Sequence, residues 1–250
     1  MIKTWFTPGL MIINGSSIDA LEHSHNAIQL IWPETKCRLN INNTLYEQAM
    51  IVAPGVSHYL QMESGWILLV EPQSLLGDMI MSALAGASYK VLPDIGYSVW
   101  IDKSSHFSFE HVIQMLEPVW QCLNIPSSML SKAEKNLQLD DRIQRLQSKL
   151  NLCFDDECLK PEAWKAASIA QDLALSESRF LHLFKQEMNI AWRPYLLWRR
   201  LLCAANAMTK GRSATEAAHI AGFSDSAHLS RTFKKMFGLS IRQAQHSLLK

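Results

Sequence analysis

The feature that most constrains this fold is an internal repeat in the C-terminal half of the chain. The pattern of residues 170–185 returns in residues 218–234. The alanines that open the two segments, Ala170 and Ala218, are 48 residues apart. The phenylalanines that precede the closing lysines, Phe184 and Phe233, are 49 residues apart. The second copy therefore carries one inserted residue just after its turn. Each copy predicts a helix, a tight turn and a second helix. A simple helical bundle would repeat its apolar period without repeating these particular residues.

Small residues occupy the same places in both copies. Ala170 and Ala218 are expected where the two helices cross, because a small side chain lets the backbones approach. Gly222 supplies the turn of the second copy, and Ala174 takes its place in the first. A serine follows each turn and is expected to accept backbone N–H groups at the start of the next helix: Ser176 and Ser224.

The second helix of each copy is expected to turn one face inward and the other toward DNA. In each copy, two apolar side chains four residues apart on the second helix are expected to point inward. The opposite face of that helix is then free to enter a major groove. The predicted base-reading residues are Ser178, Leu181 and His182 in the first copy, and Ser226, Ala227, Ser230 and Arg231 in the second. The predicted phosphate contacts are Ser176, Lys185, Arg199, Arg200, Ser224 and Lys234. A helix from Tyr195 to Met208, about 20 Å long, would connect the two units.

At these residues the chain resembles the AraC/XylS family of transcription regulators. The resemblance rests mainly on residues 222–238 (GFSDSAHLSRTFKKMFG), with support from residues 175–185 and the connecting helix. It implies a DNA-binding domain over residues 138–250 with two helix-turn-helix units, and partners that include double-stranded DNA and RNA polymerase. Leu181 departs from this pattern, since a polar base reader is common there; it predicts apolar contact with a thymine methyl or weak reading by the first unit.

The distribution of charge agrees with a sensor part joined to a DNA-binding part. Residues 1–137 contain 7 Lys and Arg against 12 Asp and Glu, whereas residues 138–250 contain 17 against 11. No apolar run approaches the about 20 residues of a membrane span. The five cysteines are odd in number and irregularly spaced, which is typical of a reduced protein. We therefore expect a cytoplasmic protein without membrane contact.

The N-terminal half reads as β-rich, and the chain as α+β. Turn residues break the first 100 residues at intervals of about 10, which favours an antiparallel sandwich or barrel. Strands are expected near residues 27–32 and 50–52, a short helix over residues 74–85, a longer helix after residue 106 and another over residues 127–138. In the C-terminal half, Asp140 or Asp141 is expected to cap a helix, Pro161 suits the first turn of the next helix, and Ser213 with Glu216 matches a capping box. The predicted division is an effector or dimerisation domain at 1–105, a helical linker at 106–137, where a homodimer could form, and the DNA-binding domain at 138–250.

Three histidines in this half resemble those of a cupin-like barrel. His23 and His25 lie two residues apart, and His58 follows a Pro-Gly turn. We expect them, with Trp32, to line a pocket for a small-molecule effector. Two alternatives stay open: purely structural roles, and a metal site in which Gln29 stands roughly where an acidic ligand would be wanted.

The expected function is therefore DNA binding rather than catalysis. We predict no catalytic residues, no cofactor and no bound metal. Two rival functions remain: a metal-dependent cupin enzyme that would need His23, His25 and His58, and a helical interaction protein that has lost DNA binding. Ile241, where the family commonly has proline, keeps the second rival open.

Overall fold

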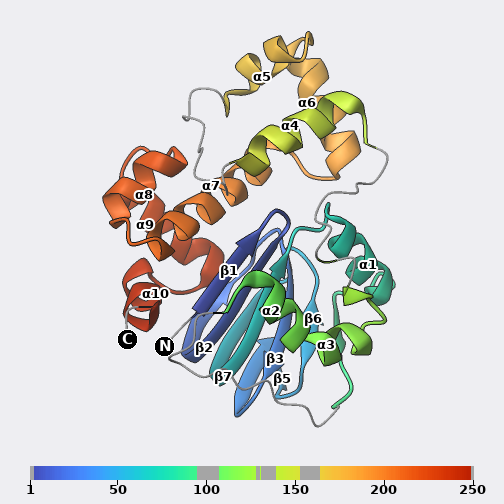
Figure 1. Cartoon of the computed structure of the whole chain (residues 1–250), viewed down its shortest axis with the longest axis vertical. Helices are drawn as coiled ribbons and strands as arrows, with labels where there is room; N and C mark the ends of the chain where they lie inside the picture. Colours follow the sequence, from blue (N-terminus) through green and yellow to red (C-terminus); the bar gives the residue numbers. More distant parts are fainter. Residues whose placement is uncertain (1–2, 95–106, 128–129, 131–138, 153–163, 249–250) are drawn as a thin grey trace. The chain divides into compact units, whose positions relative to one another are not determined.

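The computed structural model describes residues 3–94, 107–127, 130, 139–152 and 164–248. The chain divides into two compact units: Met1–Lys135 with Lys234–Lys250, and Asn136–Phe233. The first contains the whole β-sheet, and the second is built from helices (Figure 1). The predicted α+β class is therefore confirmed. Within the described residues, no helix is long and apolar enough to cross a membrane.

A single eight-stranded antiparallel sheet forms the centre of the first unit. The strand order is β1-β2-β7-β3-β6-β8, and β4 pairs with both β5 and β7. The strands are β1 (Lys3–Thr7), β2 (Leu10–His23), β3 (Ile28–Pro33), β4 (Cys37–Ile41), β5 (Thr44–Tyr46), β6 (Met50–Val52), β7 (His58–Val70) and β8 (Tyr89–Val91). The strands predicted near residues 27–32 and 50–52 are confirmed as β3 and β6.

The long strand β7 holds the sheet together. It pairs with β2 along almost its whole length, with β4 over residues 59–62 and with β3 over residues 65–70. Gly65, at φ +156°, sits where a Cβ would come within 2.6 Å of the Trp32 carbonyl oxygen, so only glycine fits at this pairing. His58, the first residue of β7, is the cross-strand partner of His23, the last residue of β2. The pairing thus brings two of the predicted pocket histidines together.

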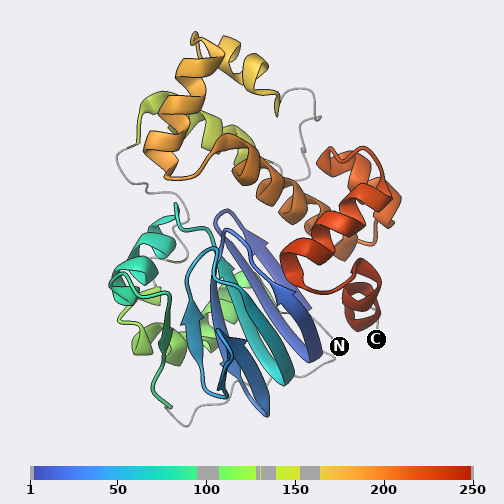
Figure 2. The same ribbon diagram turned by 180° about the vertical axis from the view of Figure 1, so that it is seen from behind.

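Helices cover one face of this sheet. Figure 1 shows α2 (Phe109–Met115) and α3 (Glu117–Cys122) in front of the strands, and Figure 2 shows the strands in front of them. The core between them buries apolar side chains from both layers, among them Trp66, Trp120 and Val112. The predicted helix over residues 74–85 is confirmed as α1 (Leu75–Leu84), capped by Ser74, whose hydroxyl accepts the Gly77 N–H.

The helix expected after residue 106 is two short helices instead of one. Helix α2 ends at Met115 with Leu116 as its C-cap, and α3 begins at Glu117 with Pro118 in its first turn. Proline has no N–H to donate and clashes with the preceding turn, so a continuous helix through Pro118 is disfavoured. Most of the helix predicted over residues 127–138 lies outside the described residues, as does the helix start predicted at Pro161.

Seven helices are described after residue 138. They are α4 (Asp141–Asn151), α5 (Ala166–Asp172), α6 (Glu177–Met188), α7 (Trp192–Thr209), α8 (Ala214–Ala221), α9 (Ser226–Phe237) and α10 (Ile241–Leu248). The connecting helix α7 is longer than predicted: its 18 residues span about 27 Å at 1.5 Å per residue. Two predicted caps are confirmed: Ser213 and Glu216 form a capping box at the start of α8, and Asp140 caps α4.

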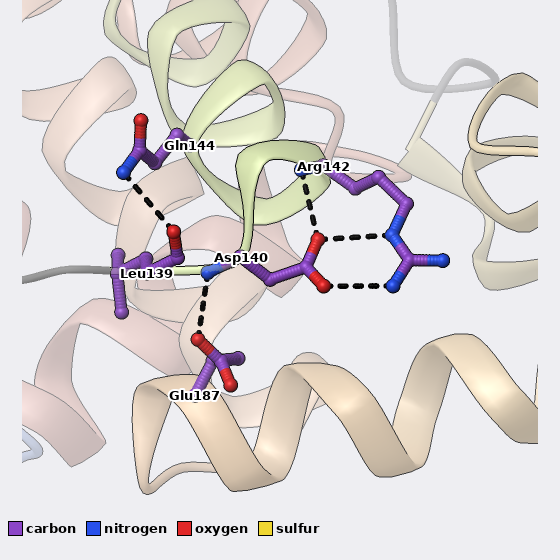
Figure 3. Close-up of polar contacts among 5 residues, drawn as sticks. All are labelled: Leu139, Asp140, Arg142, Gln144 and Glu187. Atoms are coloured by element: carbon purple, nitrogen blue, oxygen red, sulfur yellow. Dashed lines mark hydrogen bonds and ion pairs between the residues drawn. The ribbon is translucent and has the colours of Figure 1, made fainter.

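The Asp140 cap also ties α4 to α6. Its carboxylate accepts the backbone N–H of Arg142 at 2.9 Å. The same carboxylate forms an ion pair with the Arg142 guanidinium through two hydrogen bonds (Figure 3). The Asp140 N–H in turn donates to Glu187 Oε2 on α6 at 2.8 Å. The side-chain and backbone hydrogen bonds from Arg142 lower the pKa of the Asp140 carboxyl to about 2. One aspartate therefore fixes the first helix of the second unit against α6.

Candidate nucleic-acid interface

The two copies of the repeat adopt the same local structure. In the first, the turn between α5 and α6 closes with the Leu175 N–H donating to the Ala170 carbonyl at 2.8 Å. In the second, the turn between α8 and α9 closes with the Phe223 N–H donating to Ala218 at 2.9 Å. Each bond spans five residues and ends a helix in the same way. Both alanines are fully buried, as a close helix crossing requires.

The residue that makes each turn has left-handed backbone angles. Gly222 has φ +82°, which glycine adopts freely. Ala174, at the equivalent place, has φ +54°, which costs an L-residue about 1–2 kcal/mol. The predicted substitution of alanine for glycine at this turn is thus confirmed, and it leaves the first unit with a strained turn.

The cap of the second reading helix is Asp225, and the prediction of Ser224 was wrong. Ser176 caps α6 as predicted, because its hydroxyl accepts the Arg179 N–H at 3.2 Å. In α9 the His228 N–H donates to Asp225 Oδ1 at 2.6 Å, while among the described residues the Ser224 hydroxyl bonds to the side chains of Asp225 and His228. The reason is the inserted residue: the turns are 48 residues apart, but the helix starts are 49 apart.

The inward faces of the reading helices are apolar. Phe180 and Phe184 of α6 are fully buried and meet Trp192 of α7 edge-on, with ring centroids 5.4 and 5.0 Å apart. On α9, Leu229 is fully buried and Phe233 nearly so. These pairs leave the opposite face of each helix without a role in the core.

The predicted base readers lie on those opposite faces. Five of them are exposed and two half-buried: Ser178, Leu181, His182, Ala227 and Arg231 are exposed, and Ser226 and Ser230 are half-buried. Among the predicted phosphate contacts, those on the reading helices and turns are exposed: Ser176, Lys185, Ser224 and Lys234. The two reading faces differ in chemistry, since the first presents Leu181 and His182 where the second presents Ser230 and Arg231.

Arg199 does not face solvent, which contradicts its predicted phosphate contact. Its side chain is only 6% exposed, and Nη2 donates to the Leu150 carbonyl at 2.8 Å and to Asn151 Oδ1 at 2.9 Å. These acceptors close the C-terminal end of α4, where a cation also offsets the negative end of the helix dipole. Arg199 therefore joins α7 to α4.

Arg200 is differently placed from its neighbour. It is half-buried, burial lowers the pKa of its guanidinium, and Nε has no hydrogen-bond partner among the described residues. A buried donor without an acceptor is costly, about 1–3 kcal/mol.

One further cap was missed from the sequence. Ser240 and Gln243 form reciprocal bonds at the start of α10: the Gln243 N–H donates to the serine hydroxyl, and the Ser240 N–H donates to the glutamine amide oxygen. The Ser-x-x-Gln spacing of a capping box is visible in the sequence and could have found it. The family commonly has proline at the position of Ile241. Here the bonds between Ser240 and Gln243 start α10, so the helix forms without that proline.

The three predicted pocket histidines come together in the sheet unit. His23, His25 and His58 are all buried, and their ring centroids are 4.4–5.7 Å apart. Gln29 on β3, also buried, places Oε1 2.7 Å from His25 Nε2 and 3.1 Å from His58 Nε2. These four residues are called the histidine cluster below.

The histidines of this cluster are neutral near pH 7. Burial, and after it the nearby His58, lowers the pKa of His23 from 6.5 to about 3. Burial likewise lowers the pKa of His25 to about 4 and lowers that of His58. Neutral imidazole is the form that accepts a proton or binds a metal ion.

Trp32 does not join the histidine cluster. On β3 its side chain lies three residues from Gln29 and so on the opposite face, because side chains alternate along a strand. It is packed in the apolar core beside its cross-strand partner Trp66. Its predicted place in the effector pocket is therefore corrected to a place in the core.

Two helix-turn-helix units of one chain, each with a free reading face, define a DNA-binding protein, and an antiparallel sheet domain precedes them in the sequence. Comparison with known proteins agrees with this class. Residues 169–247 match the family described as "Helix-turn-helix domain". This segment, which holds both copies of the repeat, is a helix-turn-helix domain, and the match confirms the resemblance predicted from the sequence.

A curated relative is similar over part of the chain. The chain is 26% identical over 121 residues to "Probable transcriptional regulator LumQ" of Photobacterium leiognathi. The match covers 47% of this chain and 48% of that protein, so the chain spans about half the length of the curated relative it matches.

Solved structures share the whole fold. A crystal structure of ToxT from Vibrio cholerae superposes with a TM-score of 0.51 at 13% identity, covering 97% of this chain and 100% of that one. A structure of an apo ToxT variant from the same organism gives a TM-score of 0.52 at 10% identity, covering 96% and 98%. At these identities the likeness concerns the fold: a sheet domain followed by a helical domain.

Proposed function

We propose that this chain is a sequence-specific transcription regulator that reads two successive major grooves with α6 and α9. The observation that carries the proposal is the repetition of one local structure in two places, each with a buried inner face and an exposed outer face. Two such units on one chain can bind two grooves about 34 Å apart on the same side of the duplex. Acting on DNA, the protein would work in the cytoplasm.

Base reading is assigned to the exposed face of each reading helix. Arg231 is the strongest candidate, because a guanidinium can donate two hydrogen bonds to O6 and N7 of guanine. Leu181 on α6 suits a thymine methyl group. The remaining proposed readers are Ser178, His182, Ser226, Ala227 and Ser230.

Phosphate contacts would fix the position of both helices. Lys185 and Lys234 are exposed near the ends of α6 and α9. Ser176 and Ser224 stand beside the starts of these helices, where free N–H groups attract anions. Arg200, half-buried on α7, stays a proposed phosphate contact through its guanidinium. Arg199 is left out of this set because it is buried against α4.

The sheet domain would control this activity. We divide the chain into an effector or dimerisation domain at 1–105, a linker at 106–137 and a DNA-binding domain at 138–250. The histidine cluster offers buried polar groups for a small ligand, and a DNA-bound regulator of this kind would act on RNA polymerase. A homodimer would appear in sedimentation as twice the mass of one chain.

The test is selection of bound sequences from random duplex DNA, followed by a salt series on the enriched sequence. We expect a motif with two blocks about one helical turn apart, and affinity that falls steeply with salt. Failure to enrich any sequence, both with the full chain and with residues 138–250 alone, would refute the proposal.

Two substitutions on α9 separate reading from positioning. Arg231→Ala should cost about 1–3 kcal/mol on the selected site and relax its sequence preference at one position. Lys234→Ala is the matched control: it should weaken binding to all sequences alike and reduce the salt slope by about one. If Arg231→Ala left both affinity and preference unchanged, its role as a base reader would be wrong.

A further inference from the structure

We propose that the first reading helix recognises the C5-methyl group of a pyrimidine, so that 5-methylcytosine in DNA serves it as thymine does. The inference rests on the proposed function, because it names what α6 reads once this helix lies in a major groove. The residue that carries it is Leu181, a leucine that is 37% exposed on the reading helix. Thymine and 5-methylcytosine present the same methyl group at the same place in the groove.

The core of the helical unit fixes the place of Leu181. Phe180 and Phe184 are fully buried, and their rings meet Trp192 edge-on at 5.4 and 5.0 Å. The hydroxyl of Ser176 caps the first turn of the same helix. Each residue turns a helix by about 100°, so Leu181 emerges beside this core and not within it. The leucine is therefore held on the outer surface of a well-anchored helix.

An apolar side chain has few suitable partners in a major groove. The base edges there carry nitrogen and oxygen donors and acceptors, and the C5-methyl group is their distinctive apolar group. A polar base atom covered by leucine would lose its water without gaining a hydrogen bond, which is unfavourable. Leu181 therefore favours a base that carries the methyl group. The equivalent residue of the second copy is Ser230, 49 residues later, so this contact belongs to the first unit.

The polar neighbours of Leu181 suit either pyrimidine. Ser178 lies three residues before it, and therefore beside it on the helix surface, and His182 follows it; both are exposed. Thymine carries an acceptor at C4, whereas cytosine carries a donor there. A serine hydroxyl both donates and accepts, and a neutral imidazole does so through its two nitrogens. Lys185, four residues after Leu181, is assigned to a phosphate. The methyl group is thus the feature that this face distinguishes best.

The second reading helix has a different chemistry. Arg231, exposed on α9, has only donors and suits the two acceptors of guanine. The equivalent residue of the first copy is His182, which has no such restriction. One unit would therefore read hydrogen-bond acceptors and the other a methyl group. Methylation of a cytosine in the block bound by α6 would then strengthen binding without any change in base sequence.

The experiment measures binding of the full-length protein to the selected duplex by fluorescence anisotropy, with one base changed at a time. The block bound by α6 is the one whose sequence preference Arg231→Ala leaves unchanged. Each thymine in it is replaced by deoxyuridine, which lacks only the methyl group. At the position that meets Leu181 the affinity should fall about fourfold, the value of one buried methyl or methylene group.

A second pair of duplexes tests the cytosine form of the same contact. Cytosine and 5-methylcytosine are placed in turn at that position, each opposite guanine, so that the two duplexes again differ by one methyl group. The methylated duplex should bind about fourfold more tightly. Both comparisons use the unchanged protein, so they do not depend on the folding of any variant.

Leu181→Ser links the methyl effect to this residue. It gives the first copy the residue type that the second copy has at Ser230, and it should bind both members of each pair equally. Ile220→Ser on α8 is the matched control, because Ile220 is 36% exposed and lies outside the reading helices. This control should keep both methyl effects.

Several outcomes would overturn the proposal. They are a block without thymine, equal binding of thymine and deoxyuridine at every position of the block, a methyl effect with thymine but none with cytosine, and a methyl effect that survives in Leu181→Ser. Each of them requires an enriched sequence. They therefore differ from failure of the proposed function itself, in which no sequence is enriched.

Discussion

Replacing Arg199 by methionine tests whether this residue holds the helical unit together or contacts DNA. Methionine keeps an apolar stem in the buried site but removes the donors to the Leu150 carbonyl and to Asn151. Hydrogen bonds from a charged group are worth about 1.5–3 kcal/mol each. Part of that value is offset because a buried charge no longer has to be desolvated. We expect Arg199→Met to lower the free energy of unfolding by about 2–3 kcal/mol.

The assay is urea unfolding followed by tryptophan fluorescence. With a slope of about 1–3 kcal/mol per molar urea, a loss of this size moves the midpoint down by about 1 M. Arg193→Met is the matched control on the same helix: Arg193 is exposed, so its removal should change stability by no more than about 0.5 kcal/mol.

The same variant is then examined on DNA. If Arg199 serves only to join α7 to α4, the salt dependence of binding should keep its slope. An unchanged unfolding midpoint, together with a salt slope reduced by about one, would show that Arg199 neutralises a phosphate and would refute the structural reasoning.

Two further predictions concern the turns of the repeat. Because Asp225 is the cap of α9, Asp225→Ala should destabilise the protein by about 0.5–2 kcal/mol in thermal unfolding. Ser224→Ala should cost less than about 0.5 kcal/mol. Equal losses would mean that the serine shares the capping role. Ala174→Gly should stabilise the protein by about 0.5–1 kcal/mol, since it relieves the left-handed backbone of an alanine at some cost in chain entropy. Ala227→Gly, in a regular helix, is the control and should destabilise the protein. A loss of stability in Ala174→Gly would show that the turn is not strained.

The sequence predicted local features well where one residue type has one dominant use. Turn residues located β3 and β6, the Ser-x-x-Glu spacing located the start of α8, and the alanine at position 174 located an unusual turn. The division into a β-rich part followed by helices came from the change of apolar period after residue 106. These signals act within a few residues, so they need no knowledge of the tertiary structure.

Predictions failed where the answer depends on partners distant in sequence. Arg199 and Arg200 are neighbours of the same chemistry, but only Arg199 meets the end of α4, some 48 residues earlier. Trp32 was expected beside the histidines, yet strand alternation sends it to the other face. The cap at Asp225 was missed for a local reason: Ser224 matched the first copy by counting from the turn rather than from the helix start.

The single inserted residue between the two copies also has a consequence for genetics. Together with the unlike side chains on α6 and α9, it makes the two halves of one molecule unequal readers. On the proposed function, the stretch of DNA read by one chain is not a palindrome and has a left and a right end. One bound molecule would therefore distinguish upstream from downstream, and inverting its site would exchange the places of α6 and α9 along the DNA.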